Sequence, residues 1–168
     1  MQADKEHRPS SVLPTKEEVF ALIPQRSPFR FVDAITEVDE NRISGKYTFR
    51  HNEGFYAGHF PGNPITPGVI LLECMCQIGI VAHGIYLHAL DLKNSDWMSE
   101  ALNWTTFFSD AECEFFHPVF PGDLVVVEAD RIYWRRKKLR SKISMYRDGL
   151  LVAQTIASGI GVQHAGKK

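Results

Sequence analysis

The stretch Gly58-His59-Phe60-Pro61-Gly62-Asn63-Pro64-Ile65-Thr66-Pro67-Gly68-Val69 leads directly into an apolar run that ends near Leu90. Its first eleven residues hold three prolines and three glycines, so the backbone is fixed at some positions and free to turn at others. The apolar run predicts a long helix that must be buried on all sides. Glu73 and Gln77 stand four residues apart in it and therefore share one face. A histidine in the turn and a carboxyl group in a buried helix indicate proton chemistry.

The composition of this 168-residue chain is that of one globular domain. Hydrophobic residues make up 44% and charged residues 23%, which supplies one core but too little length for two ordinary domains. We therefore expect a single domain over residues 1–168, with residues 1–14 as a flexible N-terminus. The net charge of −1 gives no bias toward nucleic acid as a partner.

The cysteines, the N-terminal residues and the apolar run indicate in which cellular compartment the protein is found. Three cysteines without a CxxC pair argue against a disulfide framework and against a zinc site, and we predict neither a metal nor a cofactor. The first ten residues are charged and lack the apolar core of a signal peptide, so we expect a cytoplasmic protein. Residues 68–90 are long enough to cross a membrane, but polar side chains interrupt them, so we expect no membrane span. These side chains are Glu73, Gln77, His83 and His88.

The remaining pattern is mostly that of strands. Thr15-Lys16-Glu17-Glu18 is a capping box, which predicts a short helix ended by Pro24. The predicted strands are residues 29–39, 42–50, 103–117, 124–134, 139–147 and 150–162, with a surface connection over 91–101 and a hairpin turn at Asp148-Gly149. In the last strand one face is expected to carry Leu150, Val152, Ile156, Ile160 and Val162. Two strands, a long helix and four strands predict an α+β domain in which a curved antiparallel sheet wraps a central helix.

Details of the helix can also be predicted. Thr66 is expected to cap its free amides, with Pro67 at the first helical position. Gly79 and Gly84 lower helix propensity, so we expect a strand to approach the helix closely at both.

The chain resembles the hot-dog-fold (3R)-hydroxyacyl-acyl-carrier-protein dehydratases of the FabZ type. The family's GHFPG run, its proline-glycine helix start and its acid with a glutamine four residues later are matched by residues 58–62, Pro67-Gly68, Glu73 and Gln77. Further motifs of the family are matched by Ile23-Pro24, Arg26, Pro28-Phe29, Val32-Asp33, His117-Pro118-Val119 and Pro121-Gly122-Asp123, so the likeness covers most of residues 18–162.

The resemblance implies a hot-dog-fold enzyme that removes water from (3R)-hydroxyacyl thioesters to give trans-2-enoyl products. His59 would be the base at C2, Glu73 the acid for the C3 hydroxyl, and the backbone N–H of Gly68 the donor to the thioester carbonyl. Gln77 would hold the carboxyl group of Glu73. Tyr56 and Phe60 flank the site and are candidates for substrate binding, although core packing explains them equally well.

Two departures from the family's pattern leave the pathway open. Gln25 stands where the signature usually has histidine, and Cys74 and Cys76 stand where small alanines are common. The acyl chain length, and the choice between fatty acid synthesis and a polyene or other specialised lipid pathway, are not fixed by these residues.

The resemblance also implies the partners. The substrate would arrive on acyl carrier protein as a phosphopantetheine thioester, and two subunits would form a homodimer in which each site takes His59 from one subunit and Glu73 from the other. A further trimer of dimers stays open. Residues 131–142 hold seven basic side chains and no acid, which indicates either a solvated sheet edge or a docking surface for the acidic carrier.

Two other functions are compatible with the fold. A hot-dog thioesterase would direct water at the thioester carbon with the same kind of carboxylate, but His59 within GHFPG argues against it. A non-catalytic scaffold subunit of a dehydratase complex would lack both His59 and Glu73, and both are present.

Overall fold

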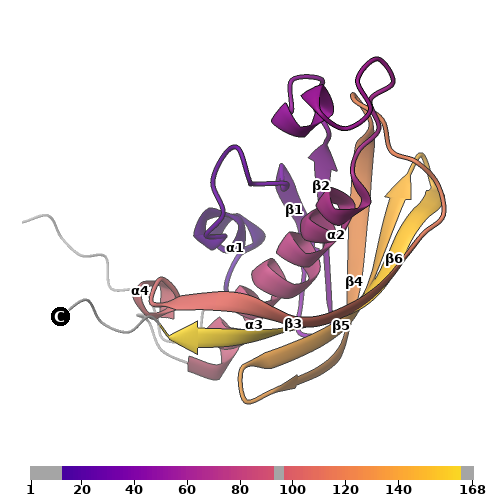
Figure 1. The fold of residues 1–168 in the computed structure, drawn as a ribbon. Coiled ribbons are helices and arrows are strands. Elements are labelled where there is room, and N and C mark those ends of the chain that lie inside the picture. Colours follow the sequence, from indigo (N-terminus) through magenta and orange to yellow (C-terminus); the bar gives the residue numbers. More distant parts are fainter. Residues whose placement is uncertain (1–12, 93–96, 164–168) are drawn as a thin grey trace, which may run out of the picture.

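The computed structural model describes residues 13–92 and 97–163, which form a curved six-stranded antiparallel sheet around one long helical rod (Figure 1). The strands are β1 (Ala34–Val38), β2 (Arg42–Thr48), β3 (Trp104–Phe115), β4 (Leu124–Arg135), β5 (Lys138–Arg147) and β6 (Leu150–Gln163). They lie in the order β1-β2-β4-β5-β6-β3. The predicted α+β hot-dog fold is confirmed. The expected flexible N-terminus falls almost entirely outside the described residues.

The helical rod has three parts, α2 (Gly68–Cys76), the π-helical segment η2 (Gln77–Ala82) and α3 (His83–Leu92). Every residue of η2 is buried. Within the described residues this rod is the one helix long and apolar enough to cross a membrane, and 67% of its most apolar window is buried inside the fold. Such burial is typical of the central helix of a folded domain.

The close approach predicted at the two helix glycines is found at one of them. A Cβ atom on Gly79 would lie 2.6 Å from Cδ1 of Ile143 in β5 and 2.9 Å from Cβ of Ala129 in β4, so the sheet packs against the helix backbone there. The same prediction is wrong for Gly84, where a Cβ atom would meet nothing within 4 Å.

Short helices close the ends of the core. In α1 (Lys16–Leu22), the Thr15 capping box is present and Val19 is buried. A 3-10 turn, η1 (Gly54–Ala57), precedes the glycine-proline stretch. Part of the surface connection predicted over 91–101, residues 93–96, lies outside the described residues. The prediction is wrong at both ends of that range, because α3 continues to Leu92 and α4 (Trp97–Ala101) buries Trp97 and Ala101 against the fold.

The first residue of β1 and the buried face of β6 differ from the prediction. β1 begins at Ala34, because the amide of Phe31 and the carbonyl of Phe29 bind the side chain of Gln77 instead of a neighbouring strand. In β6 the register shifts opposite Met145, so the residues predicted to share one face are divided. Val152 is buried together with Ala153, Thr155 and Ala157, whereas Ile160 and Val162 are exposed.

Candidate active site

The turn before the core helix has an unusual backbone. Phe60 has a φ of 63°, in the left-handed region where residues other than glycine are uncommon, and Gly62 has a φ of 85°. The amide of Asn63 donates to the carbonyl of Phe60 over 2.9 Å and closes the turn. The amide of Thr66 donates to the carbonyl of Val119 over 2.8 Å, which ties the end of the turn to the loop before β4. These two bonds close the turn and fix its C-terminal end.

This turn positions the imidazole ring of His59. Its Nδ1 lies 2.7 Å from the carbonyl oxygen of Ile65, and the ring lies against that of Phe60 with the centroids 4.2 Å apart. Because a carbonyl oxygen only accepts, Nδ1 carries the proton in the neutral ring and Nε2 is left with its lone pair. His59 is therefore arranged as a base that acts through Nε2.

A groove of about 410 Å³ joins His59 to the start of α2. Its walls are His59, Ile65, Thr66, Gly68, Leu71, Phe115, Phe116, His117 and Pro118. Gly68 is the first residue of the helix, so its N–H has no acceptor within the helix and is available to a ligand. A Cβ atom on Gly68 would lie 3.1–3.3 Å from the ring of Phe115, so glycine lets the ring of the β3 end lie directly over the helix start.

The predicted cap of this helix is wrong in detail. The N-cap residue is Pro67, which makes no side-chain cap, and the Thr66 hydroxyl instead lies 2.5 Å from the buried hydroxyl of Tyr56. Burial raises the pKa of Tyr56. A buried hydroxyl group also requires a hydrogen-bonding partner, and Thr66 supplies it. Because no side chain caps the start of the helix, the amide of Gly68 stays free for a ligand.

Glu73 is held from behind by Gln77. The side-chain amide of Gln77 donates to Oε1 of Glu73 over 2.8 Å and to the carbonyl of Phe29 over 2.9 Å, while its oxygen accepts from the amide of Phe31 over 2.8 Å. Gln77 itself is completely buried. Three hydrogen bonds therefore fix the amide that orients the Glu73 carboxyl group.

Burial raises the pKa of Glu73 above its ordinary value, and the hydrogen bond from Gln77 offsets part of this effect. A carboxyl group in such a place holds its proton to higher pH than an exposed one. It is thus suited to act as an acid.

The structure brings some of the predicted site residues together in one chain but not all of them. His59 and Gly68 share the groove, whereas Glu73 and Gln77 do not line it. Phe60 is 57% exposed beside His59, and Tyr56 is buried behind the turn.

His117 also lines the groove, and sequence reasoning assigned it no role. The available signal was that His117 itself belongs to the matched His117-Pro118-Val119 motif. Within the described residues, no group of three or more histidine, cysteine or acidic side chains is placed to hold a metal ion.

Comparison with known proteins identifies the family. Residues 23–156 match the FabA-like domain family. The 3-hydroxyacyl-acyl-carrier-protein dehydratase FabZ of Caldicellulosiruptor bescii is 35% identical over 140 residues, which cover 82% of this chain and 91% of that relative. The enzyme of the same name from Geotalea uraniireducens is 34% identical over 139 residues, covering 82% of this chain and 89% of the relative.

Solved structures agree on the fold. The dehydratase heterocomplex ApeI:P from Xenorhabdus doucetiae matches with a TM-score of 0.68 at 13% identity, covering 86% of this chain and 91% of that one. A thioesterase from Haemophilus influenzae matches with a TM-score of 0.55 at 16% identity, covering 80% of each chain. At these identities the likeness shows the fold alone, and the family follows from the sequence relatives. The chain belongs to the FabA-like domain family and is a hot-dog-fold protein of the FabZ dehydratase type.

Proposed function

We propose that this protein is a cytoplasmic dehydratase that removes water from (3R)-hydroxyacyl thioesters carried by acyl carrier protein, in fatty acid or related lipid synthesis. The observation that carries the proposal is the groove in which a base and a free helix-terminal amide, His59 and Gly68, lie together. The names of the sequence relatives support the same reaction.

The first half of the reaction takes place at C2 of the acyl chain. Nε2 of His59 removes a proton from C2, and negative charge develops on the thioester oxygen. The N–H of Gly68 donates to that oxygen, and the positive end of the helix dipole stabilises the charge. The hydrogen bond to the Ile65 carbonyl holds the ring and stabilises the imidazolium that forms.

The second half takes place at C3. The protonated carboxyl group of Glu73 donates its proton to the C3 hydroxyl, the C–O bond breaks and water leaves, while the electrons from C2 form the double bond. Gln77 presents the carboxyl group by binding Oε1. Proton exchange with solvent then returns His59 to its neutral form and Glu73 to its acid form.

The site is completed by a second copy of this chain. β3 lies at one edge of the sheet, and Phe107, Phe108 and Phe115 on it are 57%, 43% and 49% exposed. A twelve-residue edge strand with exposed aromatic rings is suited to pairing with another strand. Antiparallel pairing of two β3 strands gives a homodimer, and in it Glu73 of the partner subunit comes to the groove that holds His59.

The carrier protein docks at the β4–β5 hairpin. Within the described residues, Lys137 pairs with Asp91, and Lys138 and Arg140 pair with Asp110. Arg135 and Arg136 have no ion pair there, and they line a hollow of about 600 Å³ with Tyr133, Lys138 and Ile160. Two uncommitted guanidinium groups beside apolar surface suit an acidic helix.

The experiment is incubation of the purified protein with a 3-hydroxyacyl carrier protein, with the enoyl product and the free thiol both measured. We expect enoyl thioester without thiol release. Release of free thiol would identify the protein as a thioesterase. Binding of the carrier protein without any reaction would identify it as a scaffold.

A further inference from the structure

The hydrogen bond that holds the ring of His59 is the first of a series. Nδ1 of His59 lies 2.7 Å from the carbonyl oxygen of Ile65, and the N–H of that same peptide group, on Thr66, donates to the carbonyl of Val119 over 2.8 Å. In a trans peptide group the N–H and the C=O point in opposite directions, so the group can accept on one side and donate on the other. The peptide group between Ile65 and Thr66 therefore links the imidazole ring to the loop before β4.

A second peptide group continues the series to a carboxylate. Its carbonyl is that of Val119, and its N–H, on Phe120, donates to Oδ2 of Asp123 over 2.8 Å. Asp123 is itself anchored to the end of β2, because the amide of Phe49 donates to its carbonyl over 3.0 Å. Three hydrogen bonds and two peptide groups thus form a hydrogen-bonded path from His59 to Asp123.

Arg147 in β5 balances the charge at the end of this path. Its Nη1 donates to Oδ2 of Asp123 over 2.9 Å and to the carbonyl of Pro118 over 2.7 Å. The side chains of Arg147 and Asp123 are only 20% and 26% exposed. Charges that are partly withdrawn from water act more strongly on their surroundings than fully solvated ones, and salt screens them less. A change of charge at either residue should therefore reach His59.

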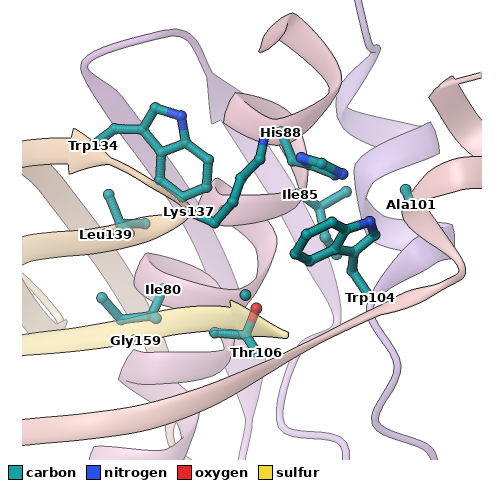
Figure 2. Close-up of a pocket in the computed structure, with 12 residues that line it drawn as sticks. Ile80, Ile85, His88, Ala101, Trp104, Thr106, Trp134, Lys137, Leu139 and Gly159 are labelled. Atoms are coloured by element: carbon teal, nitrogen blue, oxygen red, sulfur yellow. The ribbon is translucent and has the colours of Figure 1, made fainter. Parts of the chain in front are cut away.

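A histidine at the far end of the helical rod is held differently (Figure 2). His88 in α3 is 6% exposed, and neither of its ring nitrogens has a hydrogen-bond partner in the part of the chain that the structure describes. Trp104, Trp134 and Lys137 line the small cavity beside it. Burial lowers the pKa of His88. Of these two histidines, His59 is the one that hydrogen bonds connect to a carboxylate.

We propose that Asp123 is a positioning residue for His59, which orients the imidazole ring and sets how strongly its Nε2 binds a proton, and that Arg147 balances the charge of Asp123. The inference rests on the proposed dehydratase function, in which Nε2 is the base. Hydrogen bonds in series polarise one another, so negative charge at Asp123 strengthens the Ile65 carbonyl as an acceptor and stabilises the charged ring. The positive charge of Arg147 has the opposite effect.

Three variants separate the charge of Asp123 from its hydrogen bond. Asp123→Asn keeps an oxygen that can accept from the amide of Phe120 but removes the negative charge, whereas Asp123→Ala removes both. Arg147→Met removes the balancing positive charge and keeps an unbranched side chain. Circular dichroism checks that each variant is folded. The other titratable groups near the path are the same in all three variants, namely His51, Glu53, Tyr56, Glu73 and His117.

The titration of the His59 ring is followed by its imidazole nitrogen NMR signals, assigned by their absence in His59→Ala. We expect the midpoint to move to lower pH by about half a pH unit or more in Asp123→Asn, and to higher pH by a similar amount in Arg147→Met. This is the effect of one charge at roughly 10 Å and an effective dielectric constant of about 20. The shifts should persist at high salt, and the signals of His88 are the internal control that should not change.

Turnover of a 3-hydroxyacyl pantetheine thioester gives a second measurement. The acid limb of the kcat/KM profile against pH should move in the same direction as the NMR midpoint in each variant. Asp123→Ala should lower kcat about fivefold to tenfold with KM unchanged, because the ring loses its orientation while substrate binding is retained. Asp123→Asn, which keeps the acceptor, should recover part of that loss.

A His59 midpoint that stays in place in both charge variants, that moves the same way in both, or that returns to the wild-type value at high salt would overturn the inference. A protein with the two opposite shifts that dehydrates no 3-hydroxyacyl thioester would instead contradict the proposed function, because the NMR titration does not depend on turnover. The two failures are therefore distinguishable.

Discussion

The side-chain amide of Gln77 donates a hydrogen bond of 2.8 Å to Oε1 of Glu73. In a protonated carboxyl group the oxygen that accepts this bond is the carbonyl oxygen, so the O–H lies on the other oxygen and faces away from Gln77. The oxygen of Gln77 in turn accepts from the amide of Phe31. The acid of the proposed reaction is thus aimed by a residue that is itself fixed to the segment before β1.

Glu73→Gln should separate activity from stability. We expect turnover to fall about 10²–10⁴-fold, the usual effect of losing a general acid. Because burial raises the pKa of Glu73 above 4.5, its contribution to stability is complete below the pKa of the unfolded chain and is lost as the pH rises through the folded pKa. The variant cannot ionise there, so its free energy of unfolding should fall less than that of the wild type between acidic and neutral pH.

Urea denaturation of both proteins across this pH range checks the prediction. Parallel loss of stability in the two proteins would show that Glu73 does not titrate with a raised pKa.

His59→Ala should lower turnover about 10²–10⁴-fold while the protein remains folded, because the ring acts as the base and is only partly buried. His51→Ala is the matched control, since His51 is exposed and does not line the groove, and it should keep nearly the full rate. The dehydratase assay with circular dichroism measures both. A His59→Ala protein as active as His51→Ala would refute the role of His59.

Gly68→Ala should reduce kcat about tenfold or more, because the new Cβ atom pushes against the Phe115 ring, which lies 3.1–3.3 Å away, and displaces the donor amide. Gly54→Ala is the control, as a Cβ atom there meets nothing within 4 Å. Replacing Phe115 by leucine in the Gly68→Ala background should recover part of the loss. Equal rates for the two single variants would show that the helix start does not contribute to catalysis.

The double variant Arg135→Glu/Arg136→Glu should raise KM for the carrier-bound substrate about tenfold or more and leave KM for a pantetheine thioester unchanged. The effect should diminish at high salt, which screens exposed charges. Lys46→Glu, the reversal of one exposed cation on β2 away from the hairpin, is the control for a charge change outside the docking surface. A parallel rise of KM for both substrates would place the docking surface elsewhere.

Much of this fold could be predicted because its signals are local. The strand predicted over residues 42–50 and the DG turn at Asp148-Gly149 depend only on neighbouring residues. Both are found, the strand as β2 (Arg42–Thr48) and the turn with φ values of 51° and 78°. The glycine-proline stretch and the apolar run after it likewise indicated His59 and Glu73 as candidates, and the family resemblance added Gly68.

Other features depend on contacts between distant parts of the chain and could not be predicted. The hydrogen bonds that anchor Gln77 reach Phe31 and Phe29, which precede it by 46 and 48 positions in the sequence. The register shift in β6 depends on how β5 pairs with it, and it moved Ile160 to the outer face. Gly84 and Gly79 look alike in sequence, and only the surrounding packing separates them.

The central claim is that each active site takes His59 from one subunit and Glu73 from the other, and mixing the two inactive variants tests it most directly. His59→Ala and Glu73→Gln proteins are unfolded together, refolded together and assayed. In a mixed dimer one site carries both substitutions and the other carries neither, so the mixture should regain roughly a quarter of the wild-type rate if pairing is random. A mixture no more active than its components would contradict a shared site.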